Sequence, residues 1–209
     1  MRGPNESEGI RFAARVASDP SGVILLWKSL TGGKAVGCLR CGWVPEILDA
    51  AGLLPILLDS EEAGAEFSGW IDAFLTDTAA CAVPPGRNPS REVEALDRLE
   101  AIADWARSVS GSPVAEGLLW KSLRSYQALR GHLSALEERC LQDPGFLAPH
   151  ERRDIARAGI FLPAAAYSRL LCSIMGIDRE SSATPDEGEG GDPWIFLARR
   201  IAAEGTSPR

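Results

Sequence analysis

The chain has 209 residues, of which 45% are hydrophobic, and its formal net charge at pH 7 is −7. This is enough apolar material for the core of one soluble domain, and the acidic balance excludes a broad basic surface for nucleic acid. No apolar run reaches the roughly 18 residues that a membrane-spanning helix needs, so no membrane partner is expected. The first residues lack a signal-peptide pattern, so we expect a cytoplasmic protein whose five cysteines are reduced thiols or metal ligands.

The first part of the chain alternates helical and strand patterns. Pro45 suits the first turn of a short helix and Gly52 its stop, while the apolar run that follows is typical of a parallel strand covered on both faces. We therefore predict an α/β fold in which a small parallel sheet with flanking helices precedes a helical half. The expected elements are a helix over 11–30, a strand over 35–37, a helix over 45–51, and strands over 54–58 and 73–76.

Beyond a proline-rich break at 84–89 the apolar period becomes helical. A first helix ending near Gly111 is expected to have one face made of Val93, Leu96, Leu99 or Glu100, Ala103 and Ala106. A longer helix opened by Pro113 is expected to bury Leu119, Leu123, Tyr126, Leu133, Leu136 and Cys140, and shorter helices follow at about 149–158 and 163–175. The predicted organisation is an α/β domain over 1–86, a helical region over 87–176, an acidic glycine-rich linker over 177–192, and a C-terminal helix and tail over 193–209.

Several short motifs resemble those of the 2-hydroxyacyl-CoA dehydratase and benzoyl-CoA reductase family. They occur in the family's order and cover, with gaps, roughly residues 34–176. In this sequence they are Val44-Pro45-Glu46 with Ala50 to Pro55, Gly69-Trp70-Ile71-Asp72 through Cys81, Leu99-Glu100, Tyr126-Gln127 to Arg130, and Ala158 to Pro163.

The resemblance implies radical chemistry on an acyl-CoA, driven by one electron from a [4Fe-4S] cluster. The chain is much shorter than the family's usual subunit, and only Cys81 falls on a family position for a cluster cysteine. We therefore expect an accessory or regulatory subunit that binds a full-length family subunit or a second copy of itself, with or without a cluster for electron transfer to an acyl-CoA. The alternative is a non-catalytic pseudoenzyme that acts as a protein interaction module.

Cys38 and Cys41 form a Cys-x-x-Cys pair at the end of the first expected strand. Together with Cys81 they would supply three thiolates for a [4Fe-4S] cluster, because functional loops of open α/β sheets sit at strand C-termini. Zinc would need four ligands, and a thioredoxin-like pair would be followed directly by its helix. Two small buried thiols in a tight turn are a further reading.

Glu46 matches the family carboxylate near the cluster, where it would act in proton transfer or hold the substrate. An equally good interpretation is that Glu46 is a first-turn carboxylate that interacts with the positive end of the helix dipole. The remaining cysteines, Cys140 and Cys172, lie on apolar helix faces and are expected in the core. His132 and His150 are expected at the surface or at helix caps.

Overall fold

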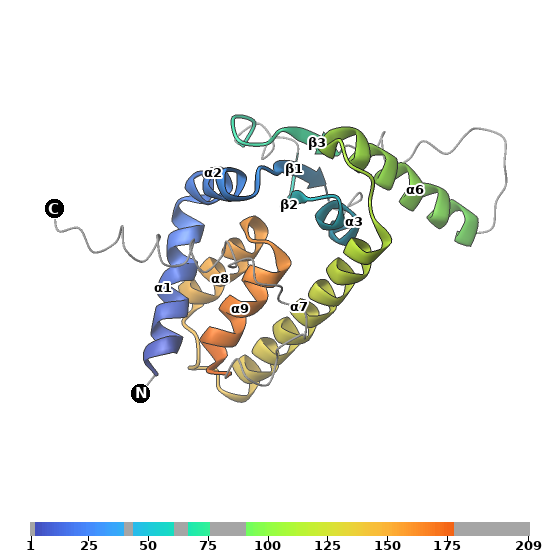
Figure 1. Ribbon diagram of the computed structural model, residues 1–209. Coiled ribbons are helices and arrows are strands. Elements are labelled where there is room, and N and C mark those ends of the chain that lie inside the picture. Colours follow the sequence, from blue (N-terminus) through green and yellow to red (C-terminus); the bar gives the residue numbers. More distant parts are fainter. Residues whose placement is uncertain (1–2, 40–43, 61–66, 76–90, 178–209) are drawn as a thin grey trace. The chain divides into compact units, whose positions relative to one another are not determined.

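The computed structural model describes residues 3–39, 44–60, 67–75 and 91–177, which form an α/β fold (Figure 1). The chain divides into two compact units: Gly32–Arg124, and Met1–Thr31 together with Ser125–Arg209. The described elements are α1 (Pro4–Ser18), α2 (Pro20–Thr31), β1 (Lys34–Leu39), α3 (Pro45–Ala50), β2 (Leu53–Leu58), β3 (Ala73–Leu75), α6 (Arg91–Ser110), α7 (Glu116–Gln142), α8 (Pro149–Phe161) and α9 (Ala164–Met175).

The division into units differs from the expected boundary at residue 86. The unit that contains the sheet also contains α6 and the first turns of α7, and the other unit joins the N-terminal helices to the rest of α7, α8 and α9. The expected linker and tail lie outside the described residues, apart from Ile177. None of the described helices has the length and apolarity to cross a membrane.

The sheet has three parallel strands in the order β2-β1-β3, which confirms the predicted small parallel sheet. Strand β1 is central: it pairs with β2 along its whole length and with β3 from Val36 to Cys38. The predicted strands are confirmed, although β1 runs two residues beyond the expected end at Gly37. This extension places Cys38 and Leu39 in the strand rather than in the turn.

One face of the sheet packs against α3 and α6. Successive strand residues point to opposite faces, so Val36 and Cys38 share this face with Leu53 and Leu75. The helices contribute apolar side chains to the same core. Its buried members are Val36, Cys38, Ile47, Leu48, Ala51, Leu53, Leu75, Ile102 and Ala106.

Two residues of the sheet fix its geometry locally. The backbone N–H of Asp72 donates to Ala35 O, and the Asp72 carboxylate accepts from Ala35 N–H, both over 2.8 Å. The Gly-x-x-Asp motif therefore fastens the start of β3 to β1. Gly37 lies where a Cβ atom would be 2.8 Å from Leu58 Cδ1 and 2.9 Å from Phe74 Cδ1, so the side chains of Leu58 and Phe74 fill the space beside this glycine.

The short helix between β1 and β2 begins and ends as predicted. Pro45 occupies the first turn of α3, where its missing N–H has no helical partner to lose. Gly52 follows the helix with a φ of 75°, a left-handed conformation that other residues rarely adopt. This helix forms the crossover that makes β1 and β2 parallel.

The predicted helices α6 and α7 are present, but the expected buried faces are partly wrong. On α6, Leu96 and Leu99 are 59% and 39% exposed, whereas Ile102 is fully buried. On α7, Leu133 is 38% exposed, and the helix begins at Glu116 rather than next to Pro113. Tyr126 and Leu136 of α7 are buried as predicted, and Ser122 and Leu129, which the prediction did not include, are buried on the same side of the helix.

The N-terminal segment forms two helices, so the single helix expected over 11–30 is wrong. Asp19 separates α1 from α2: its N–H donates to Arg15 O over 3.0 Å, closing α1. Its carboxylate accepts from Gly22 N–H over 2.9 Å and from the Ser21 hydroxyl over 2.8 Å, capping α2. Pro20 then starts α2, because proline is favoured in a first turn and breaks a helix elsewhere.

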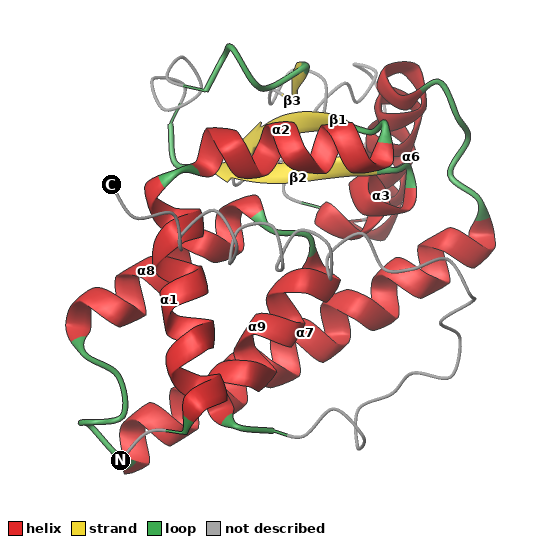
Figure 2. Ribbon diagram, turned by 60° about the vertical axis from the view of Figure 1, so that its left-hand side comes forward, coloured by secondary structure: helices red, strands yellow, loops and turns green. Residues whose placement is uncertain are grey.

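The helical unit packs α1 against α8 and α9 (Figure 2). Gly159 of α8 faces Tyr167 of α9, and a Cβ atom at Gly159 would lie 2.3 Å from Tyr167 Cε1. From α7, Arg139 donates to Met175 O at the end of α9 and lies 3.6 Å from the Glu6 carboxylate of α1. Its guanidinium carbon is also 4.1 Å from the centre of the Phe146 ring. Arg139 thus joins three segments that are distant in sequence.

Candidate functional site

Glu46 lies on the first turn of α3, directly after the chain leaves the carboxyl end of β1. Its side chain is half-buried. The carboxylate is one helical turn from Asp49, and its negative charge contributes to raising the pKa of Asp49. Glu46 therefore lies in the helix that follows the carboxyl end of β1, the edge at which ligands of open α/β folds bind, and its role as a site residue stays a prediction.

Asp49 and Ser122 form a polar contact that the sequence reasoning missed. The Ser122 hydroxyl, on a fully packed position of α7, donates to the Asp49 carboxylate over 2.7 Å. Burial raises the pKa of Asp49 above its ordinary 3.8, while the hydrogen bond from Ser122 and the charge of Lys121 oppose this shift. Two features of the sequence are related to this contact. Ser122 occupies an apolar position of α7, and Asp49 lies near the C-terminus of α3, where a negative charge interacts unfavourably with the helix dipole.

Cys38 lies inside β1 and is 0% exposed. Its neighbours across the sheet are Leu57 of β2 and Leu75 of β3, and its sulfur is 3.9 Å from Val36 O. Burial raises the pKa of the Cys38 thiol to about 12. At neutral pH this residue is therefore a neutral, apolar-packed thiol.

These observations test whether the predicted thiolates fit an iron–sulfur cluster. Cys38 does not fit, because its side chain points into the core beneath α3 and α6 rather than out of the edge of the sheet. Cys41 and Cys81 lie outside the described residues, and each follows one of the neighbouring strands β1 and β3 in sequence. Among the described side chains, no three of the His, Cys, Asp and Glu type come together as metal ligands would.

A second polar cluster, in the helical unit, was also missed. His132 of α7 is half-buried, and its Nδ1 is 2.5 Å from the hydroxyl oxygen of Ser168 on α9. The Cys172 sulfur is 3.5 Å from Nε2 and 3.8 Å from Nδ1 of the same ring. The Cys172 thiol therefore lies next to the His132 ring, and these side chains join α7 to α9.

The burial of the remaining cysteines and of the two histidines can be compared with the sequence-based expectations. Cys172 is buried as expected, whereas His132 is not a surface residue but a link between α7 and α9. His150 is exposed near the start of α8, as expected, and Cys140 is half-buried on α7. The sequence spacing placed His132 beside exposed positions, so its contact with Ser168 needed the structure.

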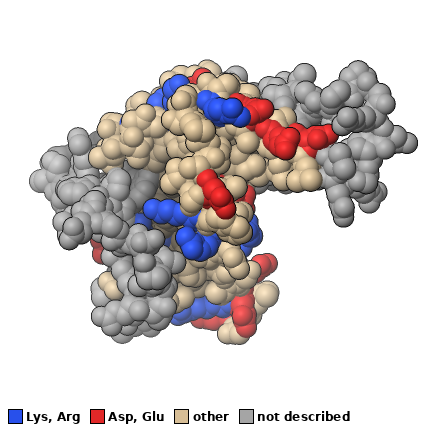
Figure 3. Space-filling view, turned by 45° about the vertical axis from the view of Figure 1, so that its right-hand side comes forward, with Lys and Arg blue, Asp and Glu red and all other residues tan. Residues whose placement is uncertain are grey.

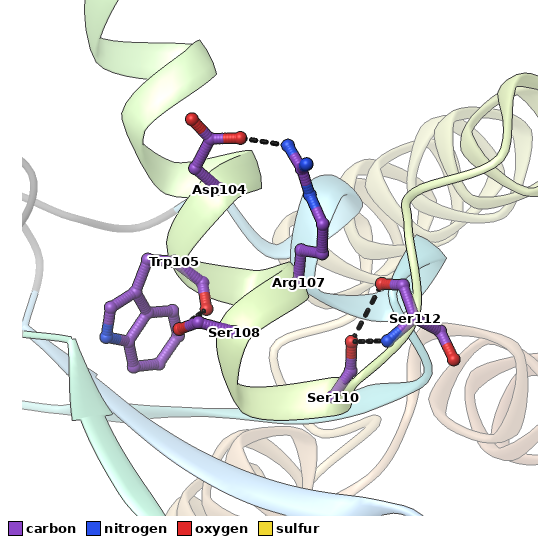
Figure 4. Close-up of polar contacts among 6 residues, drawn as sticks. All are labelled: Asp104, Trp105, Arg107, Ser108, Ser110 and Ser112. Atoms are coloured by element: carbon purple, nitrogen blue, oxygen red, sulfur yellow. Dashed lines mark hydrogen bonds and ion pairs between the residues drawn. The ribbon is translucent and has the colours of Figure 1, made fainter.

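Polar contacts at the end of α6 are local and mark a helix terminus rather than a site. In Figure 4 Arg107 pairs with Asp104, and Ser108 donates to Trp105 O over 2.7 Å. In the remaining pair of Figure 4, the Ser110 hydroxyl donates to Ser112 O over 3.0 Å and accepts from Ser112 N–H over 3.1 Å, where the helix ends. In the view of Figure 3, basic and acidic side chains are both present among the described residues.

No protein-family model matches the sequence, and a search of curated proteins finds no match. The resemblance of the motifs to the dehydratase and reductase family therefore stays a prediction.

Proposed function

We propose that this chain is a shortened accessory subunit of a complex similar to the 2-hydroxyacyl-CoA dehydratases and benzoyl-CoA reductases. The observation that carries the proposal is the sheet order, in which β1 lies between β2 and β3 with all strands parallel. The Val-Pro-Glu turn and the segment that contains Cys81 thus follow neighbouring strands, as a shared site at their carboxyl ends requires. Glu46 is the described side chain that this arrangement offers for holding an acyl-CoA or moving a proton.

The motif residues within the described part of the chain support a retained scaffold. Asp72 fastens β3 to β1, and Gly159 allows α8 and α9 to approach. Both residues belong to family-like motifs, and both have a structural role in this chain. Structural roles for these motif residues are compatible with the proposed shortened subunit.

A second candidate function is a non-catalytic interaction module without a cluster. The burial of Cys38 favours it, because one of the three predicted thiolates is absent from the edge of the sheet. Large apolar side chains exposed in the same unit also favour it, since apolar surface is common at protein interfaces. These are Phe74, Leu96, Leu99, Leu118 and Trp120.

Co-purification without oxygen tests both functions. The tagged full chain is mixed with a purified full-length dehydratase subunit, and complex formation, iron and acid-labile sulfide are measured. A stoichiometric complex with about four irons per chain, lost in Cys41→Ser and in Cys81→Ser, supports the iron–sulfur subunit. An iron-free complex supports the interaction module and overturns the cluster. No complex with that subunit overturns the accessory role.

A further inference from the structure

Side chains of β1 alternate between the two faces of the sheet, and this alternation determines the face to which Cys38 points. Val36 and Cys38 lie two residues apart, so both side chains project to the face that carries α3 and α6. Leu48 of α3 and Ile102 of α6 belong to the same core and are fully buried. The Cys38 sulfur is therefore enclosed by apolar side chains of two helices.

The backbone on both sides of Cys38 prevents the thiol from turning outward. Cys38 is paired with Leu57 on one side and Leu75 on the other, and the following residue, Leu39, is still paired with Leu58. Releasing Cys38 into a turn with Cys41 would break the end of β1 away from both neighbouring strands. It would also leave a cavity beneath α3 and α6, and such cavities destabilise a core.

A thiolate ligand would be costly at this position even without backbone movement. A metal is bound by the thiolate, and a charged sulfur in an apolar interior loses its hydration without a compensating partner. The sulfur lies 3.9 Å from the carbonyl oxygen of Val36, which can accept a hydrogen bond from a thiol but repels a thiolate. The surroundings of Cys38 thus favour the protonated form.

We infer that Cys38 is a core residue rather than a metal ligand, so the Cys38-x-x-Cys41 pair does not act as a chelate. The inference deepens the iron–sulfur form of the proposed function, because it removes one predicted ligand from the cluster. Any cluster bound at the carboxyl edge of the sheet then has at most Cys41 and Cys81 from the predicted set.

Thiol labelling of the metal-free full chain tests the inference directly. The protein is treated with iodoacetamide in native buffer and in guanidinium chloride, and mass spectrometry measures the labelling of each cysteine. Cys38 is expected to react at least about 100-fold more slowly in native buffer than in denaturant, since it must wait for unfolding. The half-buried Cys140 is the internal comparison. Native labelling of Cys38 as fast as in denaturant would overturn the inference.

Iron content of variants supplies the second readout. After anaerobic reconstitution, Cys38→Ala is expected to bind as much iron as the wild type, and Cys38→Val serves if the smaller side chain prevents folding. Loss of iron in a Cys38 variant that keeps the wild-type circular dichroism and the native protection of Cys172 would overturn the inference. If the wild type binds no iron, the iron–sulfur function fails, and the labelling experiment alone decides the role of Cys38.

Discussion

The two units of the molecule hold their helices by different means. In Gly32–Arg124, α3 and α6 lie on a continuous apolar face of the sheet, and polar contacts such as Ser122 to Asp49 add to it. In the helical unit, α8 and α9 approach at a glycine, and long side chains of α7 reach across to α9. Both units bury an apolar core, but the helical unit adds close contacts that depend on a single residue, Gly159 against Tyr167 and Arg139 with Met175 and Glu6. We therefore expect substitutions of Gly159 and Arg139 to have larger effects than those of their counterparts in the sheet unit, Gly37 and Arg107.

The largest difference is expected between two glycines. Gly159→Ala places a Cβ atom 2.3 Å from the buried Tyr167 ring, so α8 and α9 must separate, and we expect a loss of about 3 kcal/mol. Gly37→Ala meets the ends of Leu58 and the partly exposed Phe74, which can move, so a loss of about 1 kcal/mol is expected. Urea unfolding followed by circular dichroism measures both.

Gly131→Ala is the matched control, because nothing lies within 4 Å of its Cβ position on α7. Alanine is the better helix former there, so this variant should gain up to about 1 kcal/mol. Equal losses for Gly159→Ala and Gly37→Ala would contradict the proposed difference between the units.

Arginines give the next largest contrast. Arg139→Met removes the hydrogen bond to Met175 O and the ion pair with Glu6, and we expect a loss of about 2 kcal/mol. Arg107→Met removes an exposed pair with Asp104 and should cost less than about 0.5 kcal/mol. Thermal unfolding gives the comparison, and hydrogen exchange of α1 and α9 should rise only in the Arg139 variant. A neutral Arg139→Met would show that the bridge is dispensable.

The pH dependence of Asp49 probes the buried carboxylate of the sheet unit. Because burial raises the pKa of Asp49 above 3.8, the folded state binds this proton more tightly than the unfolded state does. Protonated Asp49 therefore contributes to the free energy of unfolding below pH 3.8, and this contribution is lost as the pH rises through the pKa of Asp49 in the folded state. Asp49→Asn should therefore be more stable than the wild type at pH 7, and the difference should vanish toward pH 3.8. A constant difference across this range would assign the effect to another group.

Two buried serines give the smallest contrast. Ser122→Ala leaves the Asp49 carboxylate without its hydrogen bond and should cost about 1.5 kcal/mol at pH 7, with a steeper pH dependence. Ser168→Ala deprives the half-buried His132 of one partner, but water can replace it, so about 0.5 kcal/mol is expected. Denaturant titrations at pH 7 measure both variants. A larger cost for Ser168→Ala would reverse the comparison.

Local signals in the sequence were enough to predict the strands and most helices. Pro45 and Gly52 delimit α3, and the apolar runs on either side are strands of a parallel sheet. The helix over 11–30 was wrong because the apolar pattern continues across Asp19 and Pro20, where the capping side chain ends one helix and begins the next. Capping depends on the conformation of one residue, which periodicity does not report.

The candidate site was harder to predict, because its contacts join segments far apart in sequence. Ser122 and Asp49 are separated by 73 positions, and no local pattern links them. Similarly, the expected strand ended at Gly37, just before Cys38, whereas in the structure this glycine lies inside β1, where the side chains of Leu58 and Phe74 leave no room for a Cβ atom. Glu46 was placed correctly on its helix, since the Val-Pro-Glu pattern determines its position from neighbouring residues alone.

The division of the chain into a continuous and a discontinuous unit has a consequence for synthesis on the ribosome. The unit Gly32–Arg124 is a single stretch, and its first strand pair, β1 with β2, closes over a short crossover. Contacts of this kind form quickly because little chain entropy is lost in bringing the strands together. The partners of α1, however, are α8 and α9, near the other end of the described chain. The nascent N-terminal helix must therefore wait, with its apolar side uncovered, until the sheet unit and the helices that follow it have been made.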